Sequence, residues 1–359
     1  MLRKFLPPRF NFNEEGLGLL NSLTGKQWVY SSSGKSSIYH ILKAYNIRKI
    51  MVPTYICSSV LKPICDLNIT VEFYDMDIED LNPSFKSLVA LITKDIDAVL
   101  VASMYGNPAD LISFEKYCFK NNIILIDDAA QGFGAIIDNR LVGTFGNCGF
   151  FSFSPGKPLA GHMGSFFWTD RPYSFRQKNN AAIHYLRWLE YKKNRLEIYK
   201  SGGRIIGLFL KAFRMMNDIT MRNYKDGIGK FEKKILGGIL YSHFKGEFSF
   251  RGYYVKKLSS VMRQIRIRLV KNTRGEGNPH KIILVAKNQI VAKDFRNYLG
   301  EKSIYFINGY KLLRKDDDKL PVASSVDTLI FEIPIEDDEL KMKWLINTIV
   351  EFDNDAVTK

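Results

Sequence analysis

The stretch GNCGFFSFSPGK, residues 146–157, decides how the rest of this 359-residue chain is interpreted. Cys148 to Phe153 has strand character and Ser154-Pro155-Gly156 breaks it, so Lys157 stands where a parallel strand passes into a loop. Ligands of open α/β sheets bind outside the carboxyl ends of the strands. A lysine in such a pocket can lose its proton and form a Schiff base with an aldehyde cofactor. The alternative is a surface lysine that follows a turn.

Two more segments end in groups suited to a charged ligand. Residues 123–128 form an apolar run that ends in two aspartates, as expected of a buried parallel strand with acids at its carboxyl end. Residues 28–30 pass through Ser31-Ser32-Ser33-Gly34 into a helical pattern at 37–45, and a helix amino end reached by such a turn can bind phosphate. Pyridoxal 5′-phosphate (PLP) needs three such partners, for its phosphate, its ring nitrogen and its aldehyde.

Five motifs, in the same order, resemble those of the DegT/DnrJ/EryC1/StrS sugar aminotransferases, which are PLP enzymes of the aspartate aminotransferase fold (fold type I). The motifs are SGKSS (33–37), VPTY (52–55), YGNPAD (105–110), DDAAQ (127–131) and SFSPGK (152–157). The resemblance is good over residues 15–170 and loose beyond them. It implies an α/β fold with a mainly parallel central sheet, helices on both faces and a smaller C-terminal α/β domain.

The pattern of apolar residues agrees with this architecture. Between residues 35 and 150, helical segments alternate with strand-like runs, which argues for a mainly parallel sheet covered by helices. The runs are 50–52, 70–74, 98–102 and 123–126. Near the C-terminus, further strands are expected at 281–285 and 328–335, and helices at 291–299 and 338–352. We therefore expect a large PLP-binding domain over 1–275, with a basic insert at about 180–245, and a small domain over 276–359.

The resemblance implies chemical roles for individual residues. Lys157 is the expected catalytic residue, which binds the cofactor aldehyde and then moves a proton between the substrate carbon and the cofactor. Asp128 should bond the pyridine nitrogen and keep it protonated, while Gln131 should contact the phenolic oxygen or stack near the ring. Asp127 stands where the family has glutamate, and we expect a structural role for it. A metal site at the two acids is the alternative, which the lack of a nearby histidine disfavours.

The cofactor phosphate should meet a separate group of residues. These are the backbone around Gly34 and Lys35, the region of Ser36, and the hydroxyl of Ser152. In the family a residue of the partner subunit often completes this site. Ser249 stands at the position of that residue, an asparagine in the family, within a degenerate copy of its G-Y-N-Y-R motif.

The face of the cofactor ring is commonly covered by an aromatic residue in this family. Alignment places Cys57 at that position, and Tyr55, two residues earlier, is the alternative. After the lysine, the family's G-E-G-G-like turn is replaced by Gly161-His162-Met163-Gly164. His162 is therefore a candidate for substrate contact, with a purely structural histidine as the alternative.

Positive charge is concentrated in the middle of the chain. Residues 171–275 contain 25 Lys and Arg against 6 Asp and Glu, whereas the whole chain has a net charge of +15. Within this segment, residues 203–216 have a broad apolar helical face with basic edges, which is typical of a helix on an anionic membrane surface. Packing on the protein's own core or a dimer partner, and recognition of a polyanionic substrate, are the alternatives. No nucleic-acid fold motif accompanies the charge, so we expect no nucleic-acid partner.

The sequence favours a cytoplasmic protein. The first residues are basic but reach Pro7-Pro8 before an apolar run develops, and no segment is apolar for long enough to cross a bilayer. The basic segment could hold the protein at the inner face of the membrane. The four cysteines show no CxxC pairing and are expected to be reduced core residues. They are Cys57, Cys65, Cys118 and Cys148.

The resemblance implies an aminotransferase that acts as a homodimer. It would convert a keto sugar, linked to a nucleotide, into an amino sugar, with L-glutamate as the donor. The pathway would be synthesis of a surface polysaccharide, a lipopolysaccharide or a glycosylated metabolite. The alternatives are a PLP-dependent sugar dehydratase, another non-transaminating relative, and a non-enzymatic membrane-associated scaffold. A dehydratase of this family can carry histidine in place of the lysine, so Lys157 disfavours that reading.

A P-loop nucleotide site is the remaining alternative for the serine-rich turn. Gly34-Lys35-Ser36 resembles the end of that motif. The motif also requires a glycine five residues before Gly34, where this chain has Val29. The sequence therefore disfavours an NTPase.

Overall fold

The computed structural model describes eleven stretches of the chain. They are residues 15–154, 156–159, 164–174, 177–178, 225, 227–228, 230–244, 251–314, 318–326, 328–336 and 338–355. The chain divides into two compact units, each built from two separate parts of the sequence. The first unit comprises residues 1–46 and 148–247, and the second comprises 47–147 and 248–359. The expected division of the chain near residue 275 stays a prediction.

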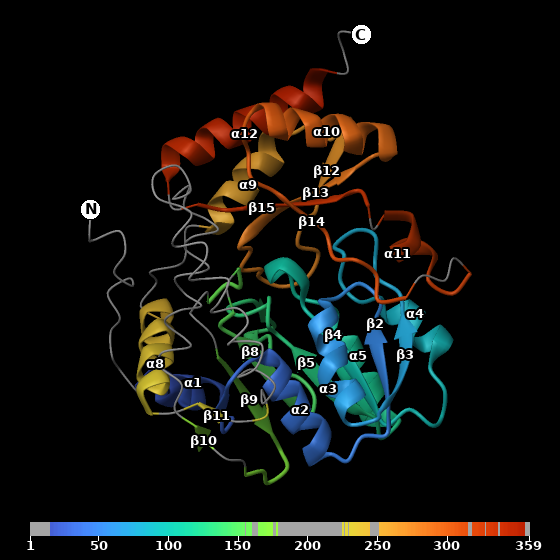
Figure 1. Ribbon diagram of the computed structural model, residues 1–359, viewed down its shortest axis with the longest axis vertical. Coiled ribbons are helices and arrows are strands. Elements are labelled where there is room, and N and C mark those ends of the chain that lie inside the picture. The colour runs from blue at the N-terminus through green and yellow to red at the C-terminus, as the bar shows by residue number, and fades with distance from the viewer. Residues whose placement is uncertain are drawn as a thin grey trace, which may run out of the picture. The chain divides into compact units, whose positions relative to one another are not determined.

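The first unit contains an antiparallel group of strands in the order β1-β9-β8. Figure 1 labels β8 and β9 of this group. β1 spans Val29–Ser31, β8 Cys148–Ser152 and β9 Ser165–Thr169. The core against them is aromatic, since the ring of Trp28 stacks on Phe151 at 4.7 Å and meets Phe166 edge-on at 5.4 Å. A short parallel pair, β10 (Gln177–Lys178) and β11 (Gly227–Ile228), belongs to the same unit.

Two long helices of this unit pack against each other at a glycine. α1 spans Glu15–Thr24 and α8 spans Lys230–Phe244. A Cβ added at Gly16 would lie only 2.1 Å from the backbone oxygen of Gly237, so glycine permits the close approach. α2 (Gly34–Ala44) packs on β8 and β9, where the hydroxyls of Ser37 and Ser165 are 2.7 Å apart. This bond fixes the amino end of α2 beside the strands.

The second unit contains a parallel sheet in the order β5-β4-β2-β3 (Figure 1). Its strands are β2 (Lys49–Pro53), β3 (Thr70–Tyr74), β4 (Ala98–Ala102) and β5 (Ile124–Asp128). β4 is buried along its whole length, as expected of a strand covered on both faces. All four strands predicted between residues 35 and 150 are thereby confirmed, and so is the mainly parallel α/β sheet.

Short helices and a hairpin join these parallel strands. The helices are η2 (Ser58–Val60), α3 (Leu61–Asp66), α4 (Phe85–Leu91), η3 (Met104–Gly106) and α5 (Leu111–Lys120). The hairpin pairs β6 (Ile136–Ile137) with β7 (Arg140–Leu141). Asp138 and Asn139 form its turn with positive φ angles of 47° and 61°, a conformation that Asn and Asp tolerate well.

A second, antiparallel sheet has the order β12-β13-β15-β14. Its strands are β12 (Ile267–Leu269), β13 (Lys281–Ala286), β14 (Ile307–Asn308) and β15 (Ile330–Pro334). The helices of this region are α9 (Arg251–Val261), α10 (Gln289–Glu301), α11 (Pro321–Val326) and α12 (Glu339–Asn354). Phe295 packs on Phe331 at 5.0 Å and on Phe352 at 4.7 Å, so α10 and α12 share one core with β15. The two strands and two helices expected here are confirmed.

Two observations bear on the expected environment. Among the helices that the structure describes, none combines the length and apolarity needed to cross a membrane. All four cysteines are free thiols, but they are not all core residues: Cys118 and Cys148 are buried, whereas Cys57 is half-buried and Cys65 is exposed. The prediction was wrong for Cys65 because it lies at the solvent face of a short helix, α3, which buries Pro63 and Ile64 instead.

Candidate cofactor site

The residues predicted to bind the phosphate lie at the amino end of α2. Ser33 caps the helix, because its hydroxyl accepts the backbone N–H of Ser36 at 3.2 Å. A Cβ added at Gly34 would lie 3.7 Å from the Ser152 hydroxyl oxygen, so the structure brings these two predicted residues together. The Ser36 hydroxyl is buried and has no hydrogen-bond partner among the described residues. A buried hydroxyl of this kind, beside a helix amino end, is suited to an anion.

Lys157 follows β8 through a tight turn in the same unit. Its backbone N–H donates to the Ser154 carbonyl at 3.2 Å, and Gly156 has a φ of 82°. The Ser152 hydroxyl accepts the backbone N–H of Ser154 at 3.3 Å, which orders the start of this turn. The lysine side chain is half-buried. The first unit thus holds the cradle residues and the predicted catalytic lysine.

The two acids at the end of β5 have different surroundings. The Asp128 side chain accepts the backbone N–H of Ala130 at 2.9 Å and is 5% exposed. Asp127 is fully buried, and one oxygen, Oδ2, accepts the backbone N–H groups of both Gly143 (2.6 Å) and Phe145 (3.1 Å). Burial raises the pKa of Asp127 to about 8, against the lowering effect of those two bonds. These contacts favour the structural role expected for Asp127.

Gln131 lies in the turn that follows β5. Its amide Nε2 donates to the Met104 sulfur at 3.6 Å, and its Oε1 is buried with no partner among the described residues. The backbone N–H of Ser103 donates to the Asp128 carbonyl at 3.1 Å. The turns after β4 and β5 are therefore joined beside Asp128.

The two candidates for the ring face differ in accessibility. Tyr55 is 1% exposed, and its hydroxyl lies 2.6 Å from the Tyr105 hydroxyl. Cys57 is half-buried, and its sulfur lies 3.1 Å from the Ser59 hydroxyl. A side chain as enclosed as Tyr55 has little surface left for a ligand, so the contacts favour Cys57 over Tyr55 at this position.

A buried polar network near Tyr55 was not expected from the sequence. The Tyr105 hydroxyl donates to Glu332 Oε1 at 2.9 Å, and Lys281 donates to Glu332 Oε2 at 2.5 Å. The ring of Tyr310 stacks on that of Tyr105. Two sequence features could have indicated this network: the tyrosine of the YGNPAD motif, and a single charged residue within an apolar strand, as in IFEIP at 330–334.

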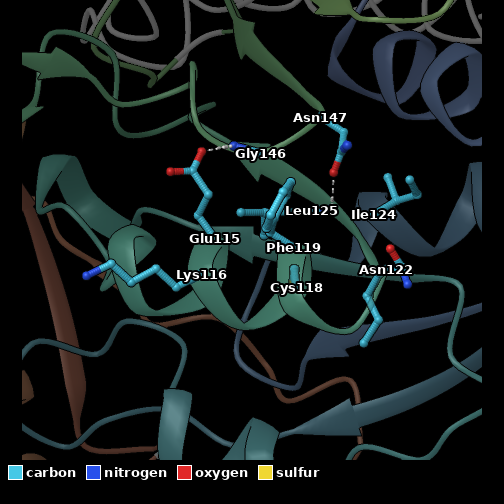
Figure 2. A pocket seen from close by; sticks show the side chains of 10 residues that line it. Glu115, Lys116, Cys118, Phe119, Asn122, Ile124, Leu125, Gly146 and Asn147 are labelled. Atoms are coloured by element: carbon cyan, nitrogen blue, oxygen red, sulfur yellow. Dashed lines mark hydrogen bonds between the residues drawn. The ribbon is translucent and has the colours of Figure 1, made fainter.

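A cavity of about 550 Å³ lies elsewhere in the second unit (Figure 2). It is lined by Glu115, Lys116, Cys118, Phe119, Asn122, Ile123, Ile124, Leu125, Gly146 and Asn147. Ile124 begins β5, so this cavity lies at the amino end of a strand whose carboxyl end carries Asp128. Ligands of parallel sheets bind at the carboxyl ends, and no predicted site residue lines this cavity.

Three sequence predictions fall outside the described residues. They concern Ser249, His162 and the helical segment 203–216. The second-subunit contact, the substrate contact and the membrane contact assigned to them therefore stay predictions.

Comparison with known proteins shows which family the first half of the chain is similar to. Residues 20–176 match the family model of the DegT/DnrJ/EryC1/StrS aminotransferase family. The chain is 32% identical over 122 residues to GDP-4-keto-6-deoxy-D-mannose 3-dehydratase of Escherichia coli O55:H7, which covers 34% of this chain and 31% of that protein. It is 31% identical over 134 residues, 36% of each protein, to UDP-N-acetyl-3-dehydro-alpha-D-glucosamine 3-aminotransferase of Acidithiobacillus ferrooxidans. These alignments span about a third of each relative.

The fold is that of solved PLP enzymes. The structure of the E. coli GDP-4-keto-6-deoxy-D-mannose-3-dehydratase with bound hydrated PLP matches with a TM-score of 0.68 and 18% identity. The match covers 94% of this chain and 91% of that one, and it confirms the expected fold type I architecture. Over residues 20–176, the chain is similar to the DegT/DnrJ/EryC1/StrS aminotransferase family.

Proposed function

We propose that this protein is a PLP-dependent aminotransferase that converts a nucleotide-linked keto sugar into an amino sugar, with L-glutamate as donor. The observation that carries the proposal is Lys157, which follows β8 in the SFSPGK motif, inside the residues that match the family. The relatives include both an aminotransferase and a dehydratase of nucleotide sugars. A lysine at position 157 favours transamination, because the dehydratases of this family can carry histidine there.

Each unit holds residues whose chemistry suits a part of PLP. The amino end of α2 and the unpartnered, buried hydroxyl of Ser36 suit the phosphate group. In the second unit, the unpartnered Oε1 of Gln131 and the buried carboxylate of Asp128 suit the ring substituents and the protonated ring nitrogen. A buried carboxylate is favoured in its charged form only beside a positive group, which a pyridinium supplies.

Each residue has a distinct task in the proposed reaction. When bound, PLP draws electrons from the substrate carbon and so eases the loss of its proton. The Lys157 amine would hold the cofactor aldehyde and would serve as the base that takes and returns this proton. Asp128 keeps the ring nitrogen protonated, and the α2 amino end with Ser152 anchors the phosphate. Asp127 holds the turn at 143–145 through its two backbone bonds.

The wider setting belongs to the same proposal. Similarity to this family supports a homodimer and a pathway that makes a surface polysaccharide, a lipopolysaccharide or a glycosylated metabolite. We also propose that the basic segment 171–275 adds salt-sensitive affinity for anionic vesicles. Equal sedimentation with neutral and anionic vesicles at low salt would remove the membrane proposal and leave the enzymatic one intact.

The enzymatic proposal is tested by the visible absorbance of the purified, PLP-loaded protein. We expect a band from lysine-bound PLP, its loss on addition of L-glutamate, and its return with a suitable keto sugar. Lys157→Ala should abolish the covalent band, while Lys302→Ala, which changes an exposed lysine at the end of α10, should leave it unchanged. A covalent band that persists in Lys157→Ala would refute the assignment.

The product distinguishes the two reactions that the relatives carry out. Mass spectrometry of a turned-over keto sugar should find an amino group in place of the carbonyl oxygen. Loss of a ring hydroxyl with the carbonyl retained would instead identify a dehydratase. Failure to bind PLP at all would favour a non-enzymatic role.

A further inference from the structure

Tyr310 lies in the loop that follows β14 and is held by two other tyrosines. Its backbone N–H donates to the Tyr55 hydroxyl at 3.3 Å. Its ring meets that of Tyr55 edge-on at 5.9 Å and stacks on that of Tyr105 at 6.4 Å, with 25° between the ring planes. Backbone and ring are thus both fixed, while the side chain remains half-buried rather than enclosed.

The tyrosines that hold Tyr310 rest on a buried ion pair. The Tyr55 and Tyr105 hydroxyls are 2.6 Å apart, and Tyr105 also donates to Glu332, which pairs with Lys281. Tyr105 is 1% exposed and Glu332 is 2% exposed. Tyr105 has a φ of 59°, a left-handed conformation that a bulky residue adopts only when its surroundings impose it. The network therefore acts as a rigid support.

This support stands at the carboxyl edge of the parallel sheet, where the second unit's cofactor residues lie. The register of β4 and β5 places Ala102 beside Asp128, and Tyr105 follows three residues later. Cys57 lies two residues after Tyr55 in the turn that follows β2. Burial raises the pKa of Tyr310 well above its ordinary value, with added contributions from the charges of Glu332, Cys57, Tyr55 and Asp128. The phenol therefore stays neutral.

We propose that Tyr310 supplies the aromatic side chain that covers one face of the cofactor ring. This inference rests on the proposed function and concerns the role that alignment gives to position 57. Cys57 has no ring to stack, and Tyr55 is enclosed beneath Tyr310 and Gly309, where an added Cβ would lie 2.6 Å from the Tyr55 hydroxyl. Of the three tyrosines in this cluster, Tyr310 is the one that keeps exposed surface, since Tyr55 and Tyr105 are each 1% exposed. The ring of Tyr310, in the segment after β14, thus takes the place of the aromatic residue that the family has at position 57 in the turn after β2.

The test uses pyridoxamine 5′-phosphate, which occupies a PLP site without a covalent bond to lysine. Its dissociation constant is measured by calorimetry on the full-length protein after the resident cofactor has been removed. We expect Tyr310→Ala to weaken binding about 2- to 10-fold, as expected for the loss of one aromatic pair, and Tyr310→Phe to bind within twofold of the unchanged protein. The visible band of bound PLP should shift in Tyr310→Ala and not in Tyr310→Phe.

Tyr305→Ala is the matched control, because Tyr305 lies on the same segment just before β14 and is 60% exposed. It should leave the affinity and the band unchanged. Equal affinity and an unshifted band in Tyr310→Ala would overturn the proposal, and so would equal weakening by Tyr310→Phe, since that would implicate the hydroxyl. In either case the unchanged protein would still bind PLP. If the unchanged protein did not bind PLP, the proposed function itself would be refuted.

Discussion

Asp127 offers the sharpest test of how this site is built. Its Oδ2 accepts two backbone N–H groups, while its Oδ1 is buried with no partner among the described residues. Asparagine has the same shape, and its carbonyl oxygen can take the place of Oδ2 and keep both bonds. We therefore expect Asp127→Asn to fold normally and to differ from the unchanged protein mainly in its response to pH.

The sign of that response follows from the pKa of Asp127, which burial raises from 3.8 to about 8. Between these two values the folded protein keeps a proton that the unfolded chain has released, so this residue makes the folded state less stable as pH rises. The loss is about 1.4 kcal/mol per pH unit and ends above pH 8, where both states are ionised. Asp127→Asn cannot ionise. Its stability relative to the unchanged protein should therefore rise by about 2–3 kcal/mol between pH 6 and pH 8.

The measurement is the free energy of unfolding in urea at pH 6, 7, 8 and 9, with the same cofactor content in each variant. Asp138→Asn is the control, since Asp138 is exposed in the β6–β7 turn and should leave the pH dependence unchanged. Asp127→Ala removes both bonds to Oδ2 and should be destabilised at every pH. Parallel pH curves for Asp127→Asn and the unchanged protein would refute the assignment of a raised pKa to this buried acid.

Three further buried features can each be tested by substitution and urea unfolding. Gly106→Ala should lower the free energy of unfolding by about 1–3 kcal/mol, because Gly106 has a φ of 87°. The loss should be larger still, since the new Cβ would lie 2.1 Å from a backbone oxygen. Gly300→Ala in α10 is the control: its Cβ would meet no atom within 4 Å, and it should stabilise the protein by about 0.5–1 kcal/mol. Burial lowers the pKa of His40 from 6.5 to about 4, so His40 makes the folded protein less stable as pH falls from 6.5 toward 4. His40→Phe should therefore make the free energy of unfolding depend less on pH in this range. Lys281→Met should destabilise by about 3–5 kcal/mol by leaving the Glu332 carboxylate unpaired, and the double variant with Glu332→Leu should recover much of that loss.

Much of the fold could be predicted because its signals are local. A run such as Ala98 to Ala102 shows in its own residues that it is a strand buried on both faces, and the structure gives it those limits. The amino end of α2 was predictable for the same reason, since the serine-rich turn carries its own cap. The antiparallel pairing of β8 with β9 was not, because alternation of helix and strand indicates parallel neighbours and says nothing of a strand that follows a loop.

The polar support of the site could not be predicted, since its partners are far apart in the sequence. Tyr105 and Glu332 are separated by 227 residues, and neither the YGNPAD motif nor the apolar strand IFEIP indicates the other. Burial of a carboxylate in such a strand is costly unless a cation and hydrogen-bond donors meet it, so Glu332 alone indicated that partners must exist without naming them. The same holds for Tyr310, which packs on Tyr55 from the loop that follows β14.

Some parts of the proposed site depend on short motifs and others on contacts between distant residues, and the two kinds tolerate substitution differently. The lysine, the acid and the phosphate cradle are each fixed by a short motif, so replacing any one of them removes a chemical function. Cover of the ring face needs only an apolar, flat group at the right place, and the chain can supply it from any segment that reaches the carboxyl edge of the sheet. A cysteine at position 57 is therefore tolerable provided that a rigid support, here Tyr55 and Tyr105 on the Glu332–Lys281 pair, holds another ring nearby.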